Sequence, residues 1–223
     1  MSATESTAES ILRSAIDVVE SGGAVDDPVF ATAVLNAAAD VSRRLPVTQH
    51  PLGFLHLDLS NLVDRRTARL HLWTEDFLAM ADPLGRLHDH TWELRSAVLV
   101  GELTDHVLVP VQDAAGDYLA HVVHYEDLRN RIESSPERWS LDELQERTVR
   151  QGQSYNLAPR LVHRTEVFVL PTATLVVPVE RGGPGPTVFA PRQLRCIEAA
   201  SRVPIDARVA EVALRSAAKS VTV

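Results

Sequence analysis

The sequence is poor in cysteine: Cys196 is the only one in 223 residues. A single cysteine excludes an internal disulfide and any zinc cluster built from several thiolates. It also suits a reducing compartment, and the first ten residues, MSATESTAES, lack the charged and then apolar pattern of a secretory signal. We therefore expect a cytoplasmic protein.

Basic runs and long apolar runs are missing too. The chain has 22 Lys and Arg against 30 Asp and Glu, a net charge of −8, with no basic stripe interleaved with aromatic residues. Nucleic acid and anionic membranes are therefore not expected as partners. No apolar run approaches the roughly 18 residues that a membrane span needs. The composition, 45% hydrophobic and 23% charged, is that of a soluble globular protein, which we expect to be a monomer or homodimer.

The spacing of apolar residues changes along the chain. Residues 9–23 and 26–45 carry helical patterns, and in the second Asp27 is placed as N-cap with Pro28 at the first helical position. From about Pro51 short β-type runs follow, separated by turn residues as in a barrel or sandwich. A helical insert is expected near 140–149 (SLDELQERTV), and a closing helix from Pro204 to about Lys219.

These patterns predict a mainly β protein in three parts. Residues 1–50 would form an N-terminal helical extension, residues 51–190 a β barrel with the helical insert, and residues 191–223 a C-terminal helical segment.

A pair of histidines stands out in LHDHTWE, residues 87–93. Alternate residues of a strand face the same way, so His88 and His90 would present their imidazoles side by side to one metal ion. The candidate third ligand is His163, which follows a glycine-led strand and a proline turn. Three histidines with open positions suit Fe(II), and also Ni, Mn, Cu or Zn. The alternative is a pair of surface or hydrogen-bonded histidines on a solvated strand.

The surroundings of the pair follow a recognisable order. Gly85 precedes the histidines, Gly101 closes the following strand, and Gly152, Pro159 and His163 come about 70 residues later. This order resembles the two-part signature of the cupins. The resemblance implies a double-stranded β-helix, that is, a jelly-roll-like barrel with the metal inside.

Within the cupins, residues 69–109 resemble the cysteine dioxygenase group. The likeness lies in a strand ending in Trp73, a loop to Gly85, the H-D-H-T core, and a strand ending in Gly101-Glu102-Leu103. In these three-histidine thiol dioxygenases the metal is iron. The resemblance therefore implies Fe(II) as cofactor, with His88, His90 and His163 as its ligands.

The chain departs from both patterns at the positions around the ligands. General cupins carry a glutamate ligand four or five residues after the second histidine, where this chain has Leu94 and Arg95. Glu93 lies one residue early and faces away from the histidines on a regular strand, unless a bulge turns it back. The relay of the thiol dioxygenases would need histidine and tyrosine where Val176 and Pro178 stand. Free cysteine is therefore not expected to be the substrate.

Other residues are candidates for lining the pocket or supporting the ligands. His56 shares a strand face with Asp58, and Arg69 and His71 share one with Trp73; Arg69 could hold an acidic substrate. Hydrogen-bonded strand histidines, an exposed arginine and ordinary core packing are the alternative interpretations. The candidate set comprises His56, Arg69, His71, Trp92, Glu93 and Tyr155.

The function expected from these features is that of an enzyme, a mononuclear non-haem Fe(II) cupin oxygenase or dioxygenase. Its partners would be O2 and a small metabolite that chelates the metal. One alternative is a non-redox metal-dependent cupin, an isomerase, lyase or hydrolase whose metal acts as a Lewis acid. Another is a small-molecule-binding cupin. No catalytic acid or base is assigned from the sequence.

Overall fold

The computed structural model describes residues 6–62, 66–81, 87–125, 130–181, 185–194 and 202–222. Gly85 and Cys196 lie outside these ranges. The elements, in chain order, are α1 Thr7–Glu20, α2 Pro28–Val41, the 3-10 turn η1 Ser42–Arg44, β1 Val47–His50, β2 Phe54–Asp58, η2 Ser60–Leu62, β3 Arg69–Trp73, α3 Glu75–Leu78, β4 Trp92–Gln112, β5 Tyr118–Tyr125, β6 Asn130–Arg150, β7 Ser154–Leu157, β8 Val162–Arg181, β9 Thr187–Pro191, β10 Val203–Pro204 and α4 Ala207–Ala218.

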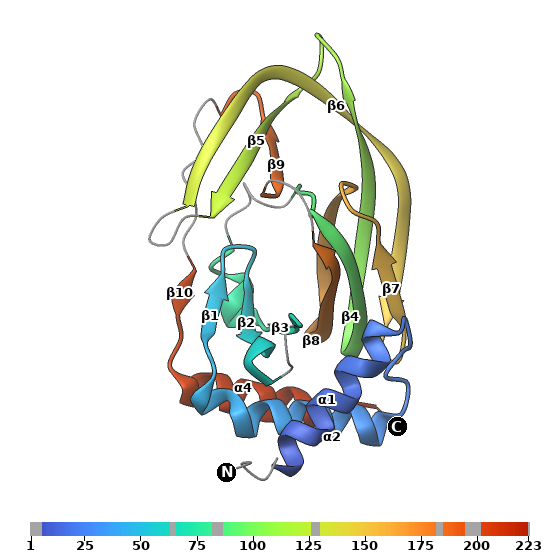
Figure 1. Cartoon of the computed structure of the whole chain (residues 1–223), viewed down its shortest axis with the longest axis vertical. Coiled ribbons are helices and arrows are strands. Elements are labelled where there is room, and N and C mark those ends of the chain that lie inside the picture. Colours follow the sequence, from blue (N-terminus) through green and yellow to red (C-terminus); the bar gives the residue numbers. More distant parts are fainter. Residues whose placement is uncertain are drawn as a thin grey trace.

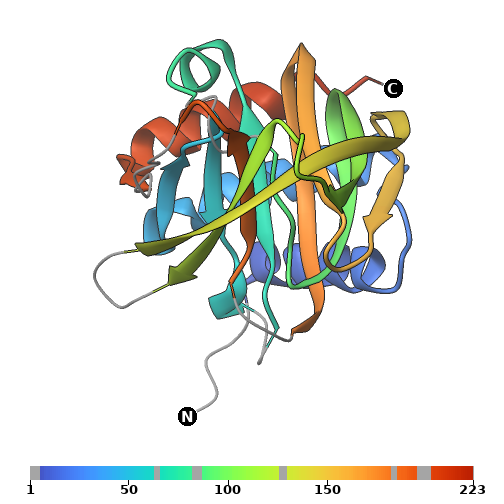
Figure 2. The same ribbon diagram turned by 90° about the horizontal axis from the view of Figure 1, so that it is seen from above.

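All ten strands belong to one antiparallel sheet in the order β10-β1-β2-β3-β8-β4-β6-β5-β9, with β7 paired to β4. Helices α1, α2 and α4 gather at one end of the molecule, and β5, β6 and β9 lie at the opposite end (Figure 1). Seen from above, the long strands curve across one another (Figure 2). The predicted mainly β, jelly-roll-like fold with N-terminal helices and a C-terminal helix is confirmed.

Strands β2 and β3 have two chemically different faces. Antiparallel pairing sets Leu55 opposite Leu72 and His56 opposite His71. Because side chains alternate along a strand, the leucines share one face and the histidines share the other. The leucines are 0% exposed and belong to the main core. The alternation of leucine and histidine thus separates a packing face from a polar face.

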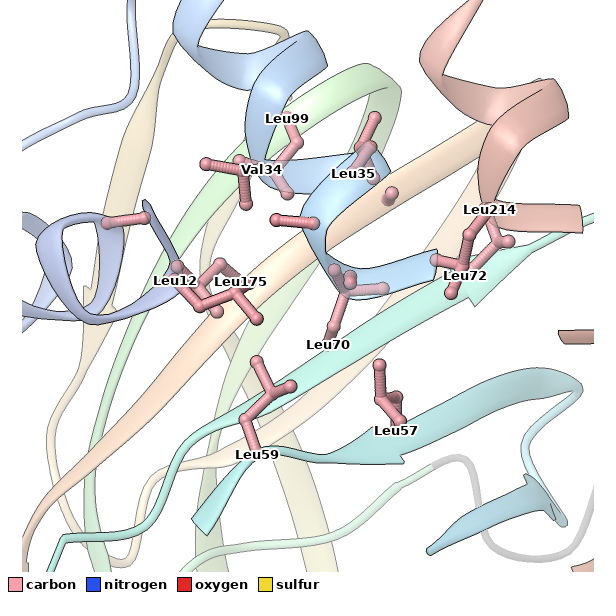
Figure 3. Close-up of a cluster of buried hydrophobic side chains, with 14 of the residues drawn as sticks. Leu12, Val34, Leu35, Leu57, Leu59, Leu70, Leu72, Leu99, Leu175 and Leu214 are labelled. Carbon is pink, nitrogen blue, oxygen red and sulfur yellow. The ribbon is translucent and has the colours of Figure 1, made fainter. Parts of the chain in front are cut away.

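The helices cover the leucine face. Asp27 caps α2 as predicted, accepting a hydrogen bond from the Val29 amide at 2.9 Å, and Pro28 begins the helix. Figure 3 shows helix and strand side chains meeting in one cluster: Leu12, Val34 and Leu35 from α1 and α2, Leu214 from α4, and Leu57, Leu59, Leu70, Leu72, Leu99 and Leu175 from the sheet region. Terminal helices and sheet therefore share a single hydrophobic core.

The helix predicted near 140–149 is wrong, because these residues are part of β6 and pair with β4. The pairing skips Leu144: Val107 faces Gln145, whereas Leu108 faces Glu143. A β-bulge with one extra residue therefore lies at Leu144. Leu141 and Leu144, three apart, imitate helical spacing in the sequence, and long-range pairing overrides the local helix propensity.

The C-terminal helix was predicted in the right place with an early start. Val203 and Pro204 pair with β1 as β10, and α4 begins at Ala207 after its N-cap Asp206. Among the described residues, no helix combines the length and the apolar character that crossing a bilayer requires.

Candidate metal centre

The three histidines predicted as ligands come together at the start of β8. His88 forms isolated antiparallel bridges with His163 and with Val188 of β9. The His88 amide donates to the His163 carbonyl at 3.2 Å, and the His163 amide donates to the His88 carbonyl at 2.8 Å. Backbone pairing across 75 positions of sequence therefore brings the H-x-H pair beside the distant third histidine.

A buried carboxylate fixes the short segment between the two histidines. Asp89, 5% exposed, accepts from the Thr187 amide at 2.6 Å and pairs with Arg160 at 3.2 Å. The Arg160 amide in turn donates to the His90 carbonyl at 2.8 Å. These contacts hold the backbone on both sides of Asp89, which limits how far the neighbouring rings can move apart.

The imidazole nitrogens converge as ligands of one ion would. The ligand atoms of His88, His90 and His163 all lie within 4.8 Å of one another. His90 Nε2 and His163 Nε2 are 3.0 Å apart. Two ligand atoms at a right angle with metal bonds of about 2.1 Å are separated by roughly the same 3.0 Å. The donor set therefore fits a first-row divalent metal.

A residue that the sequence analysis did not single out orients His163. Asp105, 0% exposed, accepts from His163 Nδ1 at 2.9 Å and from Arg147 at 2.8 and 3.1 Å. With its proton on Nδ1, His163 turns the Nε2 lone pair toward the other rings. Burial acts to raise the pKa of Asp105, but the hydrogen bond from His163 and the charge of Arg147 lower it overall. The sequence signal that could have revealed this role is the place of Asp105 between Leu103 and Val107, at a strand position that faces inward.

His90 is held neutral and flat against an indole. Burial, followed by the charges of His88, His163 and Arg69, lowers its pKa well below 6.5. The ring stacks on Trp92 with centroids 4.2 Å apart and planes 24° apart. Neutral imidazole is the form that binds metal, so this environment prepares His90 to act as a ligand.

Glu93 does not reach the three histidines. The sheet register shifts between Trp92 and Glu93, but the carboxylate turns to Arg95 Nε at 2.8 Å. Arg95 also donates to the Glu20 carbonyl at the end of α1. Among the residues that the structure describes, the ligand group at this place consists of His88, His90 and His163.

Near the histidine group lies a wall of aromatic and basic side chains from β1, β2 and β3, which Arg69 and Trp92 link to His90. His56 and His71 have ring centroids 5.6 Å apart, and Phe54 lies 4.3 Å from His71 and 4.3 Å from His50. Burial first, and then the charges of Arg202 and Arg69, lower the pKa of His56 to about 3. The structure brings two of the predicted pocket residues, His56 and His71, into this wall.

Two arginines give this wall a positive charge. The Arg69 guanidinium lies 5.4 Å above the Trp92 ring, which in turn stacks on His90. Arg202 Nη1 is 3.3 Å from His56 Nε2, so the neutral imidazole accepts from the arginine. Arg69 was predicted as a pocket residue, whereas Arg202 and His50 were not. The position of Arg202 depends on the pairing of β10 with β1, far apart in sequence, whereas His50 reaches the wall through the short β1–β2 hairpin.

The remaining side of the site is apolar. Leu94, Val107, Leu157 and Val176 form a buried cluster against which Trp92 and Tyr155 pack. Tyr155 lies under Arg147, whose guanidinium is 4.7 Å from the ring centroid, and burial raises the pKa of the phenol. Tyr155 thus supports the arginine that holds Asp105.

No protein-family profile matches the chain, and neither does any curated protein. Among solved structures it resembles a hydroquinone 1,2-dioxygenase from Sphingomonas sp. TTNP3 (TM-score 0.33, 12% identity, 54% of this chain and 62% of that chain). It also resembles an oxalate oxidase (0.32, 18%, 75% and 73%) and a variant of Bacillus subtilis oxalate decarboxylase (0.33, 11%, 60% and 27%). At this level of similarity, function has to be inferred from the chain's own residues. The likeness to cysteine dioxygenases stays a prediction.

Proposed function

We propose that this protein is a mononuclear, non-haem metal-dependent oxygenase that uses Fe(II) and acts on a small anionic metabolite able to chelate the metal. The observation that carries the proposal is the convergence of three imidazoles, with no carboxylate among them, within 4.8 Å. Neutral ligands leave a divalent ion its full charge and several open positions. A chelating anion would offset that charge.

The rival interpretation is a cluster of histidines that only hydrogen-bond to one another. The 3.0 Å contact between His90 Nε2 and His163 Nε2 would suit such a bond. That contact joins two of the rings, whereas one metal ion accounts for the convergence of all three ligand atoms within 4.8 Å. The Asp105 carboxylate on His163 Nδ1 also follows the pattern of histidine ligands, whose second nitrogen donates to a carboxylate.

Fe(II), when bound, supplies the redox chemistry by which O2 reacts with an organic substrate. The residues of the chain would keep the site in order. Asp105 holds the proton on His163 Nδ1, and Trp92 fixes the plane of His90. Arg69 and Arg202 would attract and orient the anion from the neighbouring wall, and the apolar cluster beside β4 would limit the access of water.

The proposal is tested by elemental analysis together with O2 uptake. The purified protein is loaded anaerobically with Fe(II) and offered a panel of small chelating anions, namely hydroxy acids, keto acids, catechols and amino acids. We expect about one iron per chain and substrate-dependent O2 consumption. A redox-inert metal without uptake would indicate the isomerase, lyase or hydrolase alternative, and the absence of stoichiometric metal would indicate a binding protein. Either result would refute the oxygenase.

The anionic character of the substrate has its own test. Arg69→Gln removes a charge that lies above Trp92, next to His90, so we expect the KM of the active substrate to rise about tenfold, which corresponds to about 1.4 kcal/mol. The matched control is Arg95→Gln, because that guanidinium binds Glu93 and the end of α1. An unchanged KM in Arg69→Gln would show that this wall does not hold the anion.

A further inference from the structure

A second group of ligating side chains lies behind the histidine centre, on the other face of β4. Asp105 points inward to His163, so the next residue, His106, points to the opposite face. Pairing with β6 sets His106 directly across from Glu146. The two groups are therefore separated by the thickness of one strand.

The bulge in β6 brings two carboxylates onto this face. Glu143 and Glu146 are three residues apart and would point to opposite sides of a regular strand. Because Leu144 is the extra residue, Glu143 pairs with Leu108, which shares the face of His106. The bulge thus re-aims Glu143 so that both carboxylates flank one imidazole.

The distances fit a metal shell better than hydrogen bonds. His106 Nδ1 is 3.6 Å from Glu143 Oε2 and 3.7 Å from Glu146 Oε2. All three ligand atoms lie within 4.8 Å of one another. Tetrahedral ligand atoms with metal bonds of about 2.1 Å lie roughly 3.4 Å apart, whereas 3.6 Å exceeds a normal hydrogen bond.

The imidazole itself points to a ligand. His106 is 8% exposed, and neither of its ring nitrogens has a hydrogen-bond partner within the part of the chain that the structure describes. A buried polar group without a partner is costly. The Glu143 and Glu146 side chains are 54% and 59% exposed, so a cation could reach the Nδ1 side from solvent.

The other charges on this face leave Nδ1 available. Glu166 lies 3.5 Å from His106 Nε2, on the far side of the ring. Arg164, in register with His106 on β8, pairs with Glu166 at 3.2 Å. Glu166 thus lies beside Nε2 without a hydrogen bond to it and is neutralised by Arg164, so it does not compete for Nδ1.

We propose that His106, Glu143 and Glu146 form a second divalent-cation site, which takes Zn²⁺ through one imidazole nitrogen and two carboxylate oxygens. Histidine and carboxylate ligands at this spacing suit that ion. The site bridges β4 and β6 across the bulge. It is independent of the proposed oxygenase function, because its ligands are different residues from the three histidines and lie on the other face of β4.

The test counts Zn²⁺ in full-length protein. After chelation and removal of the chelator, each variant is titrated with ZnCl2 by calorimetry and analysed for zinc after gel filtration. We expect two Zn²⁺ per chain in the wild type. The double variant His88→Ala/His90→Ala should bind one Zn²⁺ per chain. The quadruple variant that also carries Glu143→Gln/Glu146→Gln should bind none. The matched control on the same strand is Glu133→Gln/Glu137→Gln, which removes the same charge and should retain the remaining Zn²⁺.

Glutamine keeps the shape of glutamate, so circular dichroism and an unchanged melting temperature of the chelated protein would verify that each variant is folded. The inference is overturned if His88→Ala/His90→Ala binds no Zn²⁺. It is also overturned if adding Glu143→Gln/Glu146→Gln to that variant changes the Kd for Zn²⁺ by less than threefold. A failed histidine centre gives a different result. Zinc content would then be insensitive to His88→Ala/His90→Ala but would still fall with the glutamate substitutions.

Discussion

Replacing Asp105 with asparagine tests whether the buried carboxylate prepares His163 to bind metal. The carboxylate is 0% exposed and accepts from His163 Nδ1 at 2.9 Å. Asparagine has nearly the same shape but no charge, and its amide can rotate to offer a donor where the imidazole needs an acceptor. We therefore expect His163 to lose its fixed orientation and part of its basicity.

The magnitude follows from the role of such carboxylates. Loss of a group that orients a metal-binding histidine typically weakens metal affinity by about 10- to 100-fold, or roughly 1.4 to 2.7 kcal/mol. At a fixed, saturating metal concentration the metal-dependent stabilisation falls by the same amount. For a domain of this size the melting temperature of the metal-loaded protein should fall by roughly 3 to 10 °C more than that of the metal-free protein.

The assay compares the melting temperatures of metal-loaded and chelated Asp105→Asn, with the Kd measured by competition against a chromophoric chelator. The control is Arg147→Met, which removes the other partner of the carboxylate but leaves the bond to His163. This variant should lose folding stability in both states and keep its metal affinity. A wild-type Kd in Asp105→Asn would refute the role assigned to the carboxylate.

Three further predictions concern the same site. Each of His88→Ala, His90→Ala and His163→Ala should lose most of its metal by elemental analysis, because two donors compete poorly with water; Glu93→Ala should keep it, since Glu93 binds Arg95. Burial and neighbouring charges lower the pKa of His56 to about 3. Below about pH 6.5 the unfolded chain therefore binds a proton at His56, whereas the folded protein does not. Between pH 7.5 and 5.5 the chelated wild type should therefore lose about 1.4 kcal/mol more unfolding free energy in urea than His56→Gln, whereas Thr48→Val should keep the wild-type slope. Free cysteine should give little O2 uptake. Val176, a member of the apolar cluster beside the site, stands where the relay of the thiol dioxygenases would need histidine. Robust sulfinate formation would contradict this prediction.

The sequence predicted the parts of the site that local periodicity controls. The spacing in LHDHTWE correctly predicted that His88 and His90 lie together, although the segment precedes β4 and only His88 forms β-bridges, and the cap at Asp27 locates α2. The partners of these residues depend on register between segments far apart in the chain. Asp105 meets His163 only because β4 pairs with β8, and Arg202 meets His56 only because β10 pairs with β1. No local pattern contains that information.

The wrong helix at 140–149 has the same physical origin. A bulge adds one residue to a strand, so the spacing of apolar residues around Leu144 changes from two to three and imitates a helix. Strongly helix-forming residues such as Glu143 and Gln145 reinforce the imitation. Only the pairing of β6 with β4 decides between the two structures.

The two faces of β2 and β3 bear on how the protein could change its substrate. Leu55, Leu57, Leu70 and Leu72 carry the packing against the helices, whereas His56 and His71 contact each other on the opposite face of the strands. Because the two sets alternate along the same strands, a substitution in one set leaves the contacts of the other in place. Mutation or laboratory evolution could therefore exchange residues of the histidine face and select a new ligand without first losing the fold.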